Sequence, residues 1–277
     1  CRRFYPRSGG GTCGQCGGSA RTATMVLPLY GFVAGKPTKR GLGDERPRRL
    51  WASEVYFFEH SGEPGPLSTL YAMGGATVAG RFSRNGWLAV VNTGSAGKGF
   101  GYCAACGYAW PNGARAEGRG GTARSRHSKP GGRFQCGGQM VTRHFGHKFA
   151  TDMAEFVLSG LTHATEAEVR SVQAALEEGA ARVLNVPRGE LGSLFYYDGL
   201  DPVFVLYDNV PGGAGLARSA HGRAEEVLSE AYRVTQCDSC GPGSSCYRCL
   251  RTYGNQHYHE ELNRTAASSY LAAFANG

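Results

Sequence analysis

The side chains best suited to chemistry in this sequence are its ten cysteines. Eight of them form C-x2-C pairs, at residues 13–16, 103–106, 237–240 and 246–249. This spacing lets two sulfurs face one tetrahedral metal ion, and a structural zinc site normally takes four ligands. Disulfides in a secreted protein are the alternative, but the repeated pair spacing argues against them. The cysteines therefore predict closed structural zinc sites, with no position left for a catalytic water.

The most compact group holds four thiols within thirteen residues: Cys237, Cys240, Cys246 and Cys249. Residues 241–243 read Gly-Pro-Gly and turn the chain between the two pairs. Two redox motifs would need a thioredoxin-like context, which is missing here. We expect a four-cysteine zinc knuckle.

A second group begins at the 103–106 pair and continues to a histidine and a third cysteine. Three cysteines with one histidine are a common structural zinc set, here Cys103, Cys106, His127 and Cys136. Position in the sequence alone does not select this histidine, because His144 and His147 follow closely.

A third group is incomplete. Cys1, Cys13 and Cys16 supply three thiols, and the first histidine of the sequence is His60. The fourth ligand is therefore expected upstream of Cys1, in a longer protein of which this chain is the C-terminal piece.

The charge of the chain is divided. Residues 1–150 hold 21 Lys/Arg against 6 Asp/Glu, or +15, whereas residues 151–277 hold 9 against 16, or −7. A basic region of this size typically faces phosphates, although scattered arginines also keep a Gly-rich surface soluble. Aromatic neighbours such as Trp51 and Phe58 could add contacts to bases. The expected nucleic-acid contacts are Arg46, Arg48, Arg49, Lys98, Arg124 and Arg126.

Composition and length bound the fold. The 277 residues are 41% hydrophobic and 19% charged, which permits a packed core and excludes wholesale disorder. No apolar run approaches the roughly 18 residues of a membrane helix, so we expect a cytoplasmic protein without a membrane partner. We predict a partial zinc knuckle over 1–24, a basic β-rich region with the second zinc site over 25–150, and a zinc-binding α/β domain over 151–277.

Local patterns support a mixed α+β fold. Segments 51–58 and 87–91 are strand-like, and 203–207 is a continuous apolar strand expected to be buried on both faces. Thr165 and Glu168 form a capping box before a helix that Pro187 ends. Two further helices are expected over 216–232 and 259–274. A β-rich, Gly-rich zinc-containing part thus precedes a small α/β part with the knuckle and a closing helix.

Two glycine-rich loops need interpretation. Gly94–Gly99 resembles a phosphate-binding loop, but Asn92 and Gly99 depart from the Walker pattern, which excludes an ATP site there. In the loop from Asp208 to Gly215, either the following helix start holds an anion or the glycines serve a tight turn with positive φ. The sequence leaves both readings of this second loop open.

The run 206–217, the four-cysteine knuckle and the segment 255–264 together resemble one family, the MrfA-like zinc-binding domain. It ends a class of superfamily 2 DNA helicases and occurs in DrmB-type subunits of DISARM phage-defence systems. Upstream segments, including Arg46–Arg49 and His147–Asp152, resemble regions that precede the domain in such proteins. The resemblance covers most of residues 25–270 and implies zinc at the four cysteines of the knuckle.

The resemblance implies a zinc-stabilised, nucleic-acid-binding C-terminal region of an ATP-dependent helicase, serving DNA repair or phage defence. No Walker A loop, acidic box or arginine finger is present in the sequence, so ATP would bind only in a motor region outside this chain. No catalytic residue is assigned. The partners would be DNA, with RNA left open, and helicase motor domains in cis or in trans.

Two other functions stay open. The chain could be a motor-less DrmB-like accessory or scaffold subunit. A metal-dependent nuclease is the more remote alternative, with its polar groups supplied by His144, His147, Asp152 and Asp208.

Overall fold

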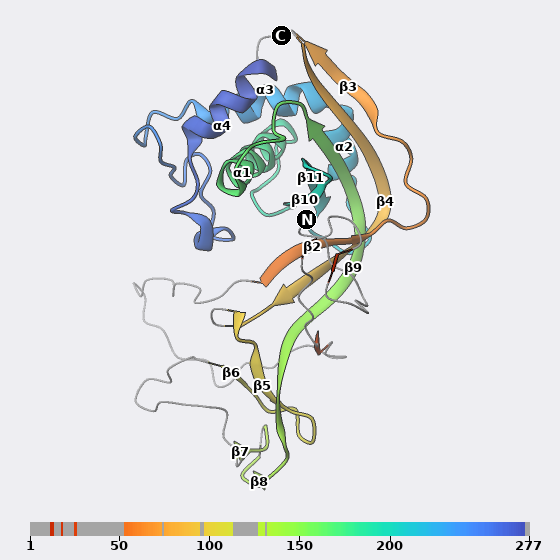
Figure 1. Ribbon diagram of the computed structural model, residues 1–277, viewed down its shortest axis with the longest axis vertical. Coiled ribbons are helices and arrows are strands. Elements are labelled where there is room, and N and C mark those ends of the chain that lie inside the picture. The colour runs from red at the N-terminus through yellow and green to blue at the C-terminus, as the bar shows by residue number, and fades with distance from the viewer. Residues whose placement is uncertain are drawn as a thin grey trace. The chain divides into compact units, whose positions relative to one another are not determined.

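The computed structural model describes residues 12, 13, 18, 25–26, 53–73, 75–94, 97–112, 127–130 and 132–274. Among the described residues, all strands but two precede the first α-helix, as in a mixed α+β fold (Figure 1). The strands are β1 (Met25–Val26), β2 (Ser53–Glu59), β3 (Ser68–Met73), β4 (Ala76–Asn92), β5 (Phe100–Cys103), β6 (Ala109–Pro111), β7 (His127–Ser128), β8 (Gln135–Cys136), β9 (Met140–Leu158), β10 (Leu191–Asp198) and β11 (Asp201–Asp208). The α-helices are α1 (Glu166–Val183), α2 (Leu216–Gly222), α3 (Ala224–Thr235) and α4 (Arg264–Leu271), with 3-10 turns at Gln256–Tyr258 and Ala272–Phe274.

Most described strands join one sheet. Its hydrogen-bonded order is β10-β11-β9-β4-β2, with β1 and β5 also paired to β9, β3 paired to β4, and β6 paired to β5. The two residues of β7 pair with those of β8 in a separate hairpin. The expected α+β class with a four-cysteine group near the C-terminus is confirmed.

The described residues divide into two compact units. One contains the ranges Val55–Ala89 and Lys148–Gly277, and the other contains Val90–His147 and β1. Strands β4 and β9 each contribute residues to both units. The boundaries expected at residues 24 and 150 stay a prediction.

The core of the first unit lies between its strands and three helices. Helices α1, α3 and α4 pack together, and α1 also packs on β10 (Figure 1). A Cβ at Gly179 of α1 would lie 2.6 Å from the backbone nitrogen of Ala231 in α3, so glycine permits the close approach of these helices. Because the four-cysteine segment follows α3 directly, this packing fixes where it starts.

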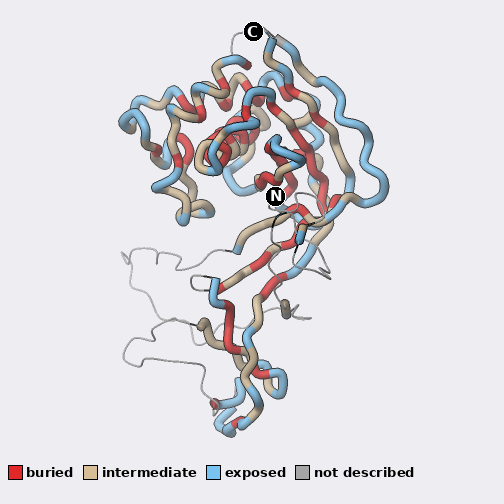
Figure 2. The backbone as a smooth tube through the Cα atoms, in the orientation of Figure 1, coloured by how far each residue is buried: buried red, intermediate tan, exposed pale blue. Residues whose placement is uncertain are grey.

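Strand β11 is buried on both faces, as its sequence predicts. Phe204 and Leu206 join the core under the helices, whereas Val203, Val205 and Tyr207 join a second apolar cluster. Buried residues also follow the C-terminal half of β9 (Figure 2). A strand with two buried faces reads as a continuous apolar run.

Helix α1 begins where its capping box predicts. The Thr165 side chain accepts from the Glu168 amide, and the Glu168 carboxylate accepts from the Thr165 amide at 2.7 Å. The helix ends at Val183, four residues before Pro187.

Two helix predictions are wrong in their bounds. The helix expected over 216–232 is interrupted at Arg223, whose φ of −119° and ψ of 33° end α2 and begin α3. The preceding Gly222 has low helix propensity and weakens the chain at that point. The closing helix expected from 259 begins only at Arg264, because the Asn263 side chain caps it by accepting from the Thr265 and Ala266 amides.

No helix in the part of the chain that the structure describes combines the length and the apolar character needed to span a bilayer.

Candidate metal centres

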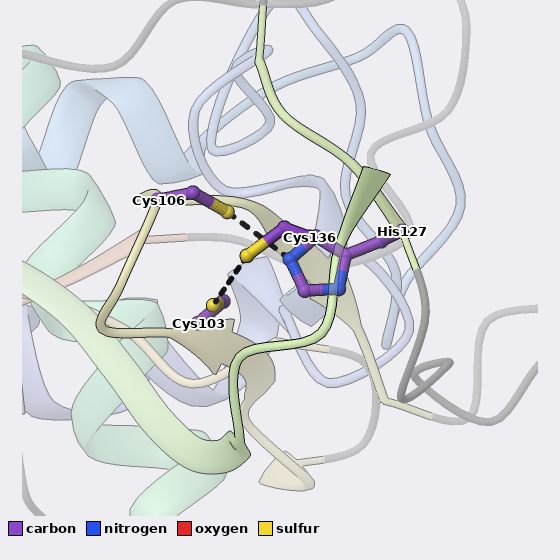
Figure 3. Close-up of side chains that lie close together, drawn as sticks. All are labelled: Cys103, Cys106, His127 and Cys136. Atoms are coloured by element: carbon purple, nitrogen blue, oxygen red, sulfur yellow. Dashed lines mark hydrogen bonds between the residues drawn. The ribbon is translucent and has the colours of Figure 1, made fainter. Parts of the chain in front are cut away.

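The structure brings Cys103, Cys106, His127 and Cys136 together (Figure 3). We call them the histidine-containing cluster. Cys103 ends β5, and the Gly107 amide donates to the Cys103 carbonyl at 2.8 Å to close the turn that carries Cys106. Gly107 has a φ of 75°, which favours glycine at this turn. The β7–β8 hairpin supplies the other two side chains, since its register sets His127 opposite Cys136.

The ligand atoms of this cluster all lie within 4.8 Å of one another. The Cys103 and Cys136 sulfurs are 4.0 Å apart, and the Cys106 sulfur is 3.1 Å from Nε2 of His127. Zinc bonds sulfur at about 2.3 Å and histidine nitrogen at about 2.0–2.1 Å, so tetrahedral ligand atoms are separated by roughly 3.5–3.8 Å. The two measured separations lie just above and just below this range, and the four groups are close enough for small side-chain shifts to place them around one tetrahedral zinc ion.

His127 is oriented by its surroundings rather than by its neighbours in the sequence. Its ring stacks on Tyr108, with centroids 4.5 Å apart and planes at 20°. The side chain is buried, and its Nε2 faces the sulfur of Cys106. The structure places His127 with the three cysteines, and neither His144 nor His147 belongs to the group.

Gly138 makes the histidine-containing cluster sensitive to one methyl group. A Cβ there would lie 2.7 Å from the Cys103 sulfur and 3.3 Å from the Cys136 sulfur. We expect Gly138→Ala to displace these sulfurs and to lower metal affinity at this cluster by about 10–100-fold, the range for disturbed metal surroundings. Bound zinc per chain, followed during titration with a chelator, measures this loss.

Gly137→Ala is the matched control for this prediction. A Cβ at Gly137 has open space within 4 Å, and the residue is not in the left-handed region. Unchanged zinc retention in Gly138→Ala would contradict the assignment of these sulfurs as ligands.

The second group joins Cys237, Cys240, Cys246 and Cys249, which we call the four-cysteine cluster. The sulfur of Cys246 lies 3.7 Å from that of Cys237 and 3.8 Å from that of Cys249. The sulfurs of Cys240 and Cys249 are also 3.8 Å apart. These separations match a tetrahedral zinc ion with four thiolates, whose sulfurs lie about 3.8 Å apart.

Arginines from the surrounding elements hold the backbone of the four-cysteine cluster. Arg188 donates to the carbonyls of Tyr247 at 2.8 Å and Arg251 at 3.2 Å, and Arg182 of α1 donates to that of Arg248 at 3.1 Å. The buried carboxylate of Glu178 pairs with both arginines, at 2.5 Å from Arg188 and 2.7 Å from Arg182. Glu178 and Arg182 of α1, with Arg188 just beyond it, thus hold the carbonyls in the second half of the cluster.

Each cluster contains one thiol whose pKa is lowered and at least one whose pKa is raised. Burial disfavours the thiolate of Cys246, but an amide at Arg248 and the neighbouring sulfurs lower its pKa to about 7. Burial raises the pKa of Cys249 to about 12. In the other cluster, burial also opposes the Cys103 thiolate, yet amides at Cys106 and Ala105 lower its pKa to about 7. A cation is needed before all thiols of a cluster can ionise together.

The remaining predicted ligands form no described group. Cys1 and Cys16 lie outside the described residues, and Cys13 is half-buried and belongs to neither cluster. Most predicted nucleic-acid contacts also lie outside the described residues, namely Arg46, Arg48, Arg49, Arg124 and Arg126. Lys98 is exposed between Gly97 and Gly99, whose φ values are 72° and 70°.

The loop after β11 has an internal carboxylate at the helix start. Asp208 is fully buried and accepts from the amides of Ala214, Leu216 at 3.2 Å and Ala217 at 2.6 Å. The Asp208 carboxylate therefore accepts the hydrogen bonds that a bound anion would need, which argues against an anion site at this helix start. The alternative reading of a tight turn is correct, since Gly212 and Gly213 have φ values of 86° and 81°.

Sequence reasoning missed this role of Asp208. The available signal was a carboxylate at a strand end, placed six to nine residues before the amides that it accepts from. The proposed nuclease groups His144, His147, Asp152 and Asp208 do not form a metal-ligand group within the described residues.

Residues 172–250 match the family model of the MrfA Zn-binding domain. The chain is 26% identical over 289 residues to Druantia protein DruE of Escherichia coli (strain UMEA 4076-1), covering 94% of this chain and 15% of DruE. The chain thus spans only about a seventh of that relative's length.

Solved structures of the DUF1998 helicase MrfA are also similar. The DNA-bound structure aligns with a TM-score of 0.42 and 14% identity, covering 81% of this chain and 24% of that one. The structure with DNA and AMPPNP aligns with a TM-score of 0.36 and 12% identity, covering 79% of this chain and 22% of that one.

Proposed function

We propose that this chain, which carries an MrfA-type zinc-binding domain, is a zinc-stabilised nucleic-acid-binding region of an ATP-dependent superfamily 2 DNA helicase. The observation that carries the proposal is the tetrahedral spacing of the four-cysteine cluster inside the matched segment. DruE, of which this chain would correspond to 15%, supports a place within a longer protein.

Zinc is the metal that we assign to both clusters. Thiolates and imidazole suit zinc, and closed sets of four such ligands are typical of structural sites. Seven of the eight free cysteines among the described residues lie in the two clusters, and unpaired thiols are typical of a reducing compartment. We therefore place the protein in the cytoplasm. The incomplete group of Cys1, Cys13 and Cys16 would bind a third zinc ion with a ligand from outside this chain.

Nucleic-acid binding rests on charge. The first 150 residues carry a formal charge of +15, from 21 basic and 6 acidic side chains. Lys148 is exposed on β9, with its Nζ 4.7 Å from the ring centre of Trp87 and 5.3 Å from that of Phe58. A cation beside half-buried aromatic rings can contact a phosphate while the rings support a base.

The helicase motor would act in cis or in trans, and ATP would bind there. A DrmB-like accessory or scaffold subunit is the second candidate, since the chain itself carries no Walker motif. Both DNA repair and phage defence are settings for such a protein. An ATPase assay on the natural full-length protein distinguishes the helicase from the accessory subunit, because only a motor-containing parent hydrolyses ATP when DNA is added.

Salt dependence tests the nucleic-acid contact. Each phosphate contact contributes about 0.7–0.9 to the slope of log affinity against log salt. We expect a slope of several units for the zinc-loaded chain, measured by fluorescence anisotropy with a labelled DNA strand between roughly 50 and 200 mM salt.

Charge reversal provides the comparison for the salt test. Arg48→Glu combined with Arg49→Glu should weaken binding and reduce the slope by about 2, since two phosphate contacts are lost. Binding that ignores both salt and these substitutions would support a protein scaffold instead. Mg²⁺- or Mn²⁺-dependent cleavage of the DNA would favour the nuclease alternative.

A further inference from the structure

A short hairpin projects from the histidine-containing cluster. Its strands β7 and β8 contain two of the four clustered side chains, His127 and Cys136, directly opposite each other. The described residues between the strands, Lys129, Pro130 and Gly132–Phe134, form what we call the hairpin tip. The Lys129 amide donates to the Phe134 carbonyl at 2.9 Å, and the Gly132 amide donates to the Lys129 carbonyl at 3.0 Å. The tip is therefore a hydrogen-bonded turn whose two strands contain the expected metal ligands His127 and Cys136.

Phe134 is the most exposed large apolar side chain in the described part of the chain. Its side chain is 78% exposed, against 68% for Leu200 and 57% for Tyr247. A phenylalanine in water forgoes most of the roughly 1.5–3 kcal/mol that burial of such a side chain gives. A single exposed apolar side chain is common on protein surfaces, so the charges around the ring decide what it could bind.

The surroundings of Phe134 are cationic. Lys129 and Arg133 are both exposed at the tip, and the sequence from 127 to 136 contains no acidic residue. A partner that covers the ring would therefore also meet two positive charges. A nucleic-acid strand offers the complementary pair of surfaces, because its bases are flat and apolar and its phosphates are anionic.

We propose that the hairpin tip binds single-stranded nucleic acid, with Phe134 stacked on an unpaired base and Lys129 and Arg133 facing the adjacent phosphates. The inference rests on the proposed nucleic-acid function and adds its substrate form and contact residues. Unpaired bases are favoured over duplex because inserting a ring between paired bases costs a few kcal/mol of unstacking.

The metal cluster adds rigidity to this contact. His127 and Cys136 hold both ends of the hairpin, and Gln135 donates to the Ser128 side chain across the strands at 3.2 Å. A contact residue on a fixed turn loses less conformational freedom on binding than one on a flexible loop.

Phe134→Ala tests the stacking contact. Base stacking on an aromatic ring is worth about 1–3 kcal/mol per base, so we expect single-strand affinity to fall about 5–100-fold. The probe is a labelled oligothymidylate strand, compared by anisotropy with a duplex of equal length. Phe134→Trp should restore single-strand affinity, and duplex affinity should change little in either variant.

Leu200→Ala is the matched control, because Leu200 is similarly exposed on the β10–β11 turn but lies between acidic residues Asp198 and Asp201. It should leave single-strand binding unchanged. Zinc content and the thermal unfolding midpoint, measured for each variant, separate a lost contact from a damaged cluster.

The slope of affinity against salt gives a second measurement, which depends on the charges of the tip and not on stacking. Lys129→Ala with Arg133→Ala should reduce the salt slope for the single strand by about 1–1.5, whereas Phe134→Ala should leave the slope unaltered. Failure of the unmodified chain to bind any strand would overturn the proposed function itself. Normal binding by that chain with no loss in Phe134→Ala would overturn only the role of the tip.

Discussion

Cys249→Ser is expected to release the metal of the four-cysteine cluster and to destabilise the unit built on α1, α3 and α4. The Cys249 sulfur is fully buried and lies 3.8 Å from those of Cys240 and Cys246. Structural zinc contributes about 10–16 kcal/mol of apparent binding energy, and a domain's whole stability is about 5–15 kcal/mol. Losing even part of that contribution leaves little net stability.

The expected result is a chain that loses one zinc equivalent and unfolds far more easily. One kcal/mol shifts the unfolding midpoint of a chain of this size by about 2–4 °C, so a loss of several kcal/mol lowers it by roughly 10 °C or more. Calorimetry measures the midpoint, and atomic emission measures zinc per chain.

Tyr247→Phe is the control for this substitution, because Tyr247 lies in the same turn but is 57% exposed and contributes no metal ligand. Its ring contact with His259 survives the change. A Cys249→Ser chain that kept both its zinc and its unfolding midpoint would show that this cluster is not a metal site.

The parts of the site that the sequence predicted are those set by local spacing. Both C-x2-C pairs of the four-cysteine cluster lie within thirteen residues, so short turns alone bring their sulfurs together. The capping box of α1 is equally local, because Thr165 and Glu168 satisfy each other's backbone. Such features survive almost any tertiary context.

Features that depend on pairing between distant residues could be predicted from the sequence only as a few alternatives. His127 joins Cys103 through a hairpin whose register sets it opposite Cys136, and no local pattern distinguishes it from His144 or His147. The long strands β4 and β9, of 17 and 19 residues, contain glycines and polar residues that hide their continuity. Their pairing partners, rather than their own propensities, keep them extended.

The exposed tip at Phe134 illustrates the same difference. The sequence gives a phenylalanine in a basic, Gly-rich stretch, and either burial or exposure is compatible with that. Only the short hairpin between His127 and Cys136 shows that the ring stays in solvent. Exposure is a property of the whole fold, so a partner surface is harder to predict than a ligand set.

Asp208→Ala is expected to be the most damaging single change outside the metal clusters. The buried carboxylate accepts from three backbone amides at the start of α2, and alanine offers them no acceptor. Each buried donor left unpaired costs about 1–3 kcal/mol, so we expect a loss of roughly 3–5 kcal/mol. Urea unfolding followed by circular dichroism measures the change in the free energy of unfolding.

Asp208→Asn separates the loss of a hydrogen-bond acceptor from the loss of side-chain volume. Asparagine keeps the volume and one oxygen, but its amide nitrogen would face the backbone donors that now bond to the second carboxylate oxygen. It should therefore recover only part of the loss. Asp201→Asn is the matched control, since that exposed carboxylate accepts only from the Thr162 hydroxyl, at 2.7 Å, among the described contacts. Equal effects at the two aspartates would mean that the loop after β11 is held by its glycine turns, with the amides of α2 left to solvent, and that the carboxylate is dispensable.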